Sequence, residues 1–239
     1  MMFSIADNIQ NVRERIQKAT IAAARPEDSV QLLAVTKTRP AIALREALES
    51  GLHCFGENYL NEALERQQAL AEMCSSDQYQ KLVWHFIGPI QSNKTKPIAQ
   101  YFDWVHSVDR EKVAIRLNDQ RPDNMVPLNV CIQVNVNQEE SKSGVLMADL
   151  NEFAGAISLL PRLKLRGLMC IPDAAQSELE LRQSFLKMKK AYQHLQNSYA
   201  DIDTLSMGMS GDIEIAIDCG STLVRVGTAL FGERAAKKG

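Results

Sequence analysis

The sequence lacks several features that would place it in a special class of protein. It has no excess of positive charge, since 27 lysines and arginines stand against 29 aspartates and glutamates and the net charge is −2. Nucleic acids and anionic membranes are bound chiefly through basic surfaces, so this balance argues against either as the main partner. No apolar run approaches the length that spans a bilayer. Charged residues such as Asp7 and Arg13 interrupt the N-terminal segment where a signal peptide would have an apolar core.

Cysteine is scarce, and no Cys-x-x-Cys motif is present. The five cysteines are widely spaced, and an odd number cannot pair completely. Cys54, Cys131 and Cys170 lie in apolar segments with the character of strands. We therefore expect reduced thiols in the core of a cytoplasmic protein, and we expect no metal site.

What the sequence does contain is a regular alternation of strand-like and helix-like segments. Ile5, Ile9, Val12, Ile16 and Ala19 recur at helical spacing and predict a helix before the first strand. Eight apolar segments follow, each separated from the next by a predicted helix. They lie at residues 30–36, 54–56, 82–87, 104–108, 128–136, 163–171 and 204–209, and within 221–231.

This alternation predicts an α/β protein, a single (β/α)8 barrel domain over residues 1–239 with an extra N-terminal helix. An open, doubly wound parallel sheet is the competing architecture, because the two folds share the same order of elements. No linker, low-complexity stretch or break in composition divides the chain.

Lys37 stands at the carboxyl end of the first predicted strand. In barrels and in open α/β sheets, the functional site lies at this end of the strands. An amine at such a position can bind a phosphate or attack a carbonyl group. The simplest alternative is that Lys37 is a solvated charge or the partner of a surface carboxylate.

The last two predicted strands end in residues that suit an anion. The seventh runs into the segment 206–211, in which Ser206 and Ser210 alternate with glycines that allow close backbone approach. The eighth contains Arg225 and is followed by Gly227 and Thr228. A phosphate typically lies after strands seven and eight of a barrel. Each segment alone is typical of a structural turn or helix cap, but together with Lys37 they indicate a phosphorylated carbonyl compound held by a lysine.

Other polar residues near strand ends have structural interpretations. His85 and His106 lie in apolar strands and are interpreted as hydrogen-bonded core histidines. Glu57 and Asn58 follow the second strand, where they are expected to cap the next helix unless they belong to the site.

Seven short segments stand in a characteristic order along nearly the whole chain. They are LAVTK at 33–37, FGENY at 55–59, WHFIGPIQSNK at 84–94, SKSG at 141–144, RGLM at 166–169, LSMGMS at 205–210 and VRVGT at 224–228. Together these segments resemble the pyridoxal phosphate homeostasis protein family, whose members have a fold similar to the barrel domain of alanine racemase.

The resemblance implies that Lys37 carries pyridoxal 5′-phosphate (PLP) as an internal aldimine. It also implies a set of further cofactor contacts around the phosphate and the ring. These are Ser206, Ser210, Gly227 and Thr228 at the phosphate, Arg225 at the pyridine nitrogen, and Asn58 and Met169 beside the ring. An arginine can only donate, so it would keep that nitrogen unprotonated and make the ring a weak electron sink.

The chain departs from the racemase pattern in two respects. Thr38, Arg39 and Pro40 follow Lys37 in place of a segment with a phosphate-contacting tyrosine, and the chain ends at Gly239, which leaves no room for the domain that brings a second base. We therefore expect a non-catalytic, monomeric protein that stores, buffers or delivers PLP in the cytoplasm, with PLP-dependent apoenzymes as partners. The alternatives are a PLP-dependent enzyme acting on amino acids, such as a racemase, and a lysine-dependent barrel enzyme acting on phosphosugars without a cofactor.

Overall fold

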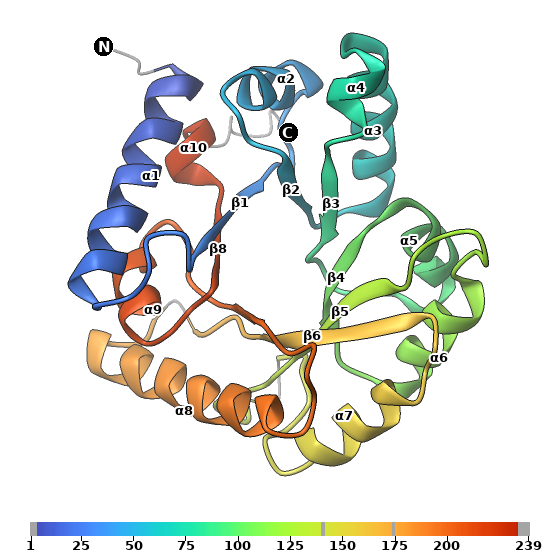
Figure 1. Ribbon diagram of the computed structural model, residues 1–239, viewed down its shortest axis with the longest axis vertical. Helices are drawn as coiled ribbons and strands as arrows, with labels where there is room; N and C mark the ends of the chain where they lie inside the picture. The colour runs from blue at the N-terminus through green and yellow to red at the C-terminus, as the bar shows by residue number, and fades with distance from the viewer. Residues whose placement is uncertain (1–3, 140–141, 174, 234–239) are drawn as a thin grey trace.

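Eight parallel strands close into a barrel in the order β1 to β8, with β1 paired to β8 (Figure 1). The computed structural model describes residues 4–139, 142–173 and 175–233, so Ser141 of the fourth characteristic segment and the C-terminal Gly239 lie outside the described residues. The strands are β1 (Gln31–Val35), β2 (Cys54–Glu57), β3 (Val83–Phe86), β4 (Trp104–Val108), β5 (Leu128–Gln133), β6 (Leu163–Met169), β7 (Thr204–Ser206) and β8 (Leu223–Val226). The predicted (β/α)8 barrel is confirmed, and the open sheet is excluded because β1 and β8 pair with each other.

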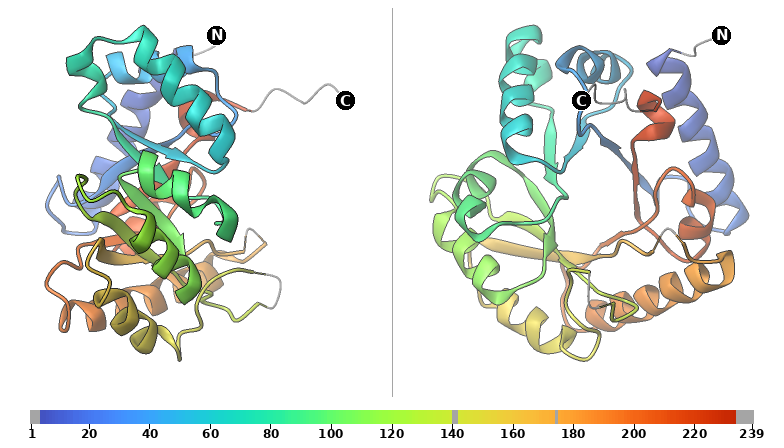
Figure 2. Two further views of the ribbon diagram at one scale, coloured as in Figure 1. Left: turned by 90° about the vertical axis from the view of Figure 1, so that its right-hand side faces the viewer. Right: turned by 180° about the vertical axis from the view of Figure 1, so that it is seen from behind.

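Helices surround the strands on all sides (Figures 1 and 2). They are α1 (Ile5–Ala22), α2 (Ala41–Glu49), α3 (Leu60–Met73), α4 (Ser76–Tyr79), α5 (Thr95–Tyr101), α6 (Glu111–Gln120), α7 (Leu150–Ser158), α8 (Glu178–Gln196), α9 (Ile213–Asp218) and α10 (Thr228–Phe231), with a short 3-10 helix η1 at Ser92–Lys94. The predicted N-terminal helix α1 packs against α9 and α10, so the first and the last described helices lie side by side (Figure 1). None of these helices is both long and apolar enough to cross a membrane, as far as the chain is described.

Alternation of side chains along the strands produces two separate apolar clusters. A small cluster of Leu33, Val35, Ile87 and Leu223 lies inside the barrel. A much larger one, which includes Phe55, fills the space between the strands and the helices. The barrel interior is therefore only partly apolar, and polar side chains occupy the rest of it.

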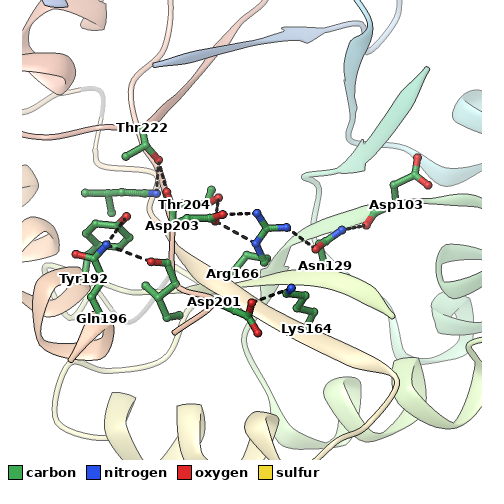
Figure 3. A network of polar contacts seen from close by, with 12 residues as sticks. Asp103, Asn129, Lys164, Arg166, Tyr192, Gln196, Asp201, Asp203, Thr204 and Thr222 are labelled. Carbon is green, nitrogen blue, oxygen red and sulfur yellow. Dashed lines mark hydrogen bonds and ion pairs between the residues drawn. The ribbon is translucent and has the colours of Figure 1, made fainter. Parts of the chain in front are cut away.

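Polar side chains close the amino-terminal end of the barrel (Figure 3). Arg166 pairs with Asp203, donates to Asn129 Oδ1 at 2.8 Å and covers the Trp104 ring at 4.7 Å. These side chains bind one another, and the opposite, carboxyl end of the strands is where a barrel has its site.

Strands β5, β6 and β7 end two or three residues earlier than predicted. Val134 and Val136 continue the apolar run beyond β5 and are buried, yet they lie outside its regular ladder. The apolar composition of a segment indicates that its side chains are buried, but not that its backbone joins the hydrogen bonds of a strand, which explains the difference. The sequence interpretation also missed α4, whose N-terminus is formed by a reciprocal capping box between Ser75 and Gln78.

Candidate functional site

Lys37 lies in a tight turn just beyond the carboxyl end of β1. The backbone N–H of Arg39 donates to Thr36 O at 3.0 Å, so Lys37 and Thr38 occupy the middle of the turn. Thr38 has a φ of 63°, a left-handed conformation that is unfavourable for a β-branched residue. Lys37 itself is partly buried. Strain next to a functional candidate is typical of binding sites.

This strain leads to a testable expectation. Replacing Thr38 with asparagine, which tolerates positive φ, should raise the free energy of unfolding by roughly 1 kcal/mol. Urea unfolding of both proteins measures the difference. Thr38→Val is the matched control because valine keeps the β-branch and hence the strain. Equal stability of the asparagine and valine variants would contradict the strain argument.

A buried ion pair fixes the ends of β1 and β2 relative to α3. Glu57 is fully buried and accepts two hydrogen bonds from Arg66, at 2.5 and 2.8 Å. Thr36 donates its hydroxyl to the same carboxylate at 2.7 Å. The expectation that Glu57 caps the next helix was wrong, since Tyr59 is the N-cap residue of α3. Its partner Arg66 is far enough along α3 that no local pattern indicated the pair.

Asn58 lies where the ends of β2 and β3 come unusually close. A Cβ atom on Gly88 would be only 2.1 Å from Asn58 O, so glycine is required there. Asn58 Oδ1 is buried without a hydrogen-bond partner among the described residues. It borders a hollow of about 270 Å³ that is lined also by Ile87, Gln133 and Ile171. Such an orphaned acceptor beside a hollow is suited to a ligand.

Arg225 is a buried cation, and its hydrogen-bond partners among the described residues are neutral groups. Its side chain donates to Ser206 O and Ser206 Oγ, both at 2.7 Å, and to Cys170 O at 2.8 Å. Burial lowers the pKa of Arg225. A buried guanidinium without a hydrogen-bonded carboxylate is costly, so an electron-rich ligand would be favoured beside it. Met169 is buried next to Cys170 and lies in register with Ser206.

Ser210, Gly227 and Thr228 meet at the corner where β8 lies beside β1. Ser210 Oγ accepts a hydrogen bond from the backbone N–H of Ala229 at 3.3 Å. A Cβ atom on Gly227 would lie 3.3 Å from Val35 O, two residues before Lys37. Ser210, Gly227 and Thr228 therefore lie together beside the end of β1, which leads into the turn at Lys37.

Ser206 occupies a different place from Ser210. Its side chain is fully buried, and its hydroxyl lies between Arg225 and His106. His106 Nδ1 is 2.9 Å from Ser206 Oγ, and His106 Nε2 is 2.9 Å from His85 Nδ1. The sequence interpretation treated these histidines as core residues. The structure confirms their burial and adds their connection to Arg225, which no spacing in the sequence could show.

Both histidines are held in the neutral form. Burial lowers the pKa of His85 to about 3. The pKa of His106 also lies well below its ordinary value, chiefly through burial, and the neighbouring His85 and the positive charge of Arg225 lower it further. His85 Nε2 has no hydrogen-bond partner in the described part of the chain.

Comparison with known proteins places this arrangement in a family. The alanine racemase N-terminal domain family matches residues 4–235. The pyridoxal phosphate homeostasis protein of Pseudomonas aeruginosa is 53% identical over 233 residues, which cover 98% of this chain and 97% of that protein. The protein of the same name from Escherichia coli K12 is 47% identical over 98% of both chains. The chain belongs to the pyridoxal phosphate homeostasis protein family.

Solved structures of the family have the same barrel. PipY of Synechococcus elongatus, solved without PLP, is 35% identical with a TM-score of 0.84, over 96% of this chain and all of that one. PipY with PLP bound is 34% identical with a TM-score of 0.81, over the same shares. Alanine racemase of Corynebacterium glutamicum is only 17% identical with a TM-score of 0.68, and the match covers 96% of this chain but 61% of the racemase. That likeness shows a shared fold.

Proposed function

We propose that this protein binds PLP and serves in PLP homeostasis by storing, buffering or delivering the cofactor. The observation that carries the proposal is the corner at which the end of β1, two residues before Lys37, lies against Gly227, with Thr228 and Ser210 next to it. Relatives near 50% identity are named for this role, and PipY has been solved with PLP bound. An amine and a cluster of small polar residues at the carboxyl ends of β1, β7 and β8 match an aldehyde that carries a phosphate.

The residues present fit each part of the cofactor. The amine of Lys37 would attack the aldehyde carbon, a C=N bond would form, and water would leave. Ser210, Gly227 and Thr228 would hold the phosphate through hydroxyl and backbone N–H groups. Arg225 would donate to the pyridine nitrogen.

Two further residues, a partly buried Asn58 and a buried Met169, complete the proposed pocket. Asn58 supplies an unpaired side-chain oxygen and Met169 an apolar surface beside the ring. Ser206 was predicted at the phosphate. We propose that it holds Arg225 instead, because its hydroxyl contacts that guanidinium and His106.

The chemistry of Arg225 supports the non-enzymatic role that we propose. PLP catalysis of amino-acid reactions relies on the ring as an electron sink, and a protonated pyridine nitrogen makes it strong. Arg225 has no acceptor atom and so cannot stabilise a proton on that nitrogen. The competing function is an enzyme acting on amino acids, which is favoured by the hollow beside Asn58 because it has room for a small amine.

A transfer experiment separates the two functions. The protein is loaded with PLP, freed of excess cofactor and mixed with an apoenzyme that requires PLP. We expect the apoenzyme to gain activity as the absorbance of the loaded protein falls. A panel of amino acids should show no turnover faster than that by free PLP. Turnover above this level would favour the enzyme, and a colourless protein that never retains PLP would refute both.

The proposed setting is the cytoplasm, with PLP-dependent apoenzymes as partners of a monomeric protein. The support is chemical, since all five cysteines are unpaired thiols, which suits a reducing compartment.

Arg225 offers a direct test of how the ring is held. In Arg225→Ala the phosphate contacts remain, so we expect the absorption spectrum of bound PLP to change more than the affinity for inorganic phosphate. Arg225→Lys is the matched control, because it retains a cation but not the planar fork. An equal loss of phosphate and PLP affinity in Arg225→Ala would point instead to a role as an anion clamp.

A further inference from the structure

Four side chains form a continuous line of hydrogen bonds through the barrel interior. Arg225 on β8 contacts Ser206 on β7 at 2.7 Å, and Ser206 lies 2.9 Å from His106 on β4. His106 lies 2.9 Å from His85 on β3. All four side chains are at most 4% exposed. Since β4 and β7 lie on different sides of the closed barrel, this line crosses its interior.

The chemistry of the groups determines which atom donates and which accepts in each of these hydrogen bonds. A guanidinium only donates, so Ser206 Oγ accepts from Arg225. The hydroxyl proton of Ser206 then needs an acceptor, and within residues 4–139, 142–173 and 175–233 His106 Nδ1 is the remaining side-chain atom recorded in contact with it. His106 therefore carries its proton on Nε2 and donates to Nδ1 of His85. The opposite direction would leave both the serine proton and the Nε2 lone pair of His85 buried without a partner, whereas this direction leaves only the Nε2 proton of His85 unpaired in the described part of the chain.

The far end of the line is also fixed. The His85 ring stacks on Trp104 with an interplanar angle of 13° and centroids 5.3 Å apart. Trp104 in turn lies under the guanidinium of Arg166 at the closed end of the barrel. Both histidines therefore have a rigid support behind them.

In every hydrogen bond of this line, the donor is on the side of Arg225 and the acceptor is on the side of His85. This common direction has an electrostatic consequence. Each bond polarises the next, so the oxygen of Ser206 becomes more electron-rich on the side that faces the guanidinium. The aligned hydrogen bonds together form a dipole that compensates part of the charge of Arg225. Among the described residues, Arg225 has no carboxylate as a hydrogen-bond partner. It also restricts the rotation of the guanidinium, because two of the recorded contacts of Nη1 are to Ser206.

We propose that His106, supported by His85, is a positioning residue that orients the Ser206 hydroxyl and thereby aims Arg225 at the cofactor ring. That Arg225 contacts the cofactor ring rests on the proposed function, whereas the assignment of donors and acceptors in these hydrogen bonds does not. A substitution at His106 should therefore act on Arg225 at a distance, through Ser206.

The test uses the ligand-free protein first. Correlation of ring protons and nitrogens by NMR should find both histidines protonated on Nε2, and the guanidinium protons of Arg225 should exchange slowly with water. In His106→Leu that exchange should become faster. In His106→Asn it should remain slow, because the asparagine oxygen can take the place of Nδ1 as an acceptor. Protonation of His106 on Nδ1, or equal exchange in both variants, would overturn the proposal.

The PLP-loaded protein provides the second measurement. His106→Leu and Ser206→Ala should weaken PLP binding roughly tenfold and shift its absorption spectrum, whereas His106→Asn should stay close to the parent. Val105→Ala is the control, since its side chain lies in the outer core beside His106 and its loss should lower only stability. Spectra that stay unchanged in His106→Leu would overturn the proposal. A parent protein that binds no PLP refutes the proposed function alone, and the ligand-free measurements still decide the role of His106.

Discussion

Lys37→Ala is expected to lose all covalent attachment of PLP while keeping a folded barrel. In the proposed function the amine condenses with the aldehyde, whereas the contacts proposed for Ser210, Thr228 and Arg225 do not involve the amine. PLP should therefore still bind, but more weakly and with the spectrum of a free aldehyde. Because Lys37 lies in a partly buried turn outside β1, its truncation removes no core packing.

Mass spectrometry after borohydride reduction measures the attachment directly. The parent protein should carry one PLP adduct that maps to Lys37, and the variant should carry none. Lys94→Ala is the matched control, since this lysine lies in η1 on the loop that follows β3 and should leave the adduct intact. An adduct of equal yield on Lys37→Ala, located elsewhere, would disprove the assignment of Lys37.

Glu57→Ala is expected to lower the free energy of unfolding by about 3–5 kcal/mol. The change leaves the guanidinium of Arg66 buried beside an empty space with its main counter-charge removed. It also removes the nearer of the two acceptors of the Thr36 hydroxyl, one residue before Lys37, and leaves only Gly56 O at 3.3 Å. Thermal or urea unfolding measures the loss, and a weaker affinity for PLP should accompany it because the turn at Lys37 is less well held.

The chain offers a close control for this prediction. Glu62 also binds Arg66, at 3.2 Å, but its side chain is 43% exposed. Glu62→Ala should therefore cost no more than about 1 kcal/mol. The double variant Glu57→Leu with Arg66→Met should recover much of the loss, since no charge then remains buried. A cost for Glu57→Ala as small as that for Glu62→Ala would show that the buried pair has little influence on stability.

Local patterns were sufficient to predict the barrel and to place several polar residues at the carboxyl ends of its strands. Each strand is an apolar run followed by a turn, and each of Lys37, Ser210, Gly227 and Thr228 follows the end of a strand. Since the carboxyl ends of parallel strands converge in a barrel, strand position alone predicts that these residues meet. The predicted ends of β5 to β7 were less accurate, because buried apolar residues continue past the last ladder bonds.

The sequence by itself therefore determined the architecture and which polar residues stand at the carboxyl ends of the strands, because both depend on short-range periodicity and on topology. Only the tertiary structure decided which polar side chains pair. His106 and Ser206 are 100 positions apart, and His85 and His106 are 21 apart. Whether Ser206 faces the phosphate corner or Arg225, and whether Glu57 caps a helix or neutralises Arg66, depends on how side chains of distant strands and helices share one buried space. No pattern within a single segment contains that information.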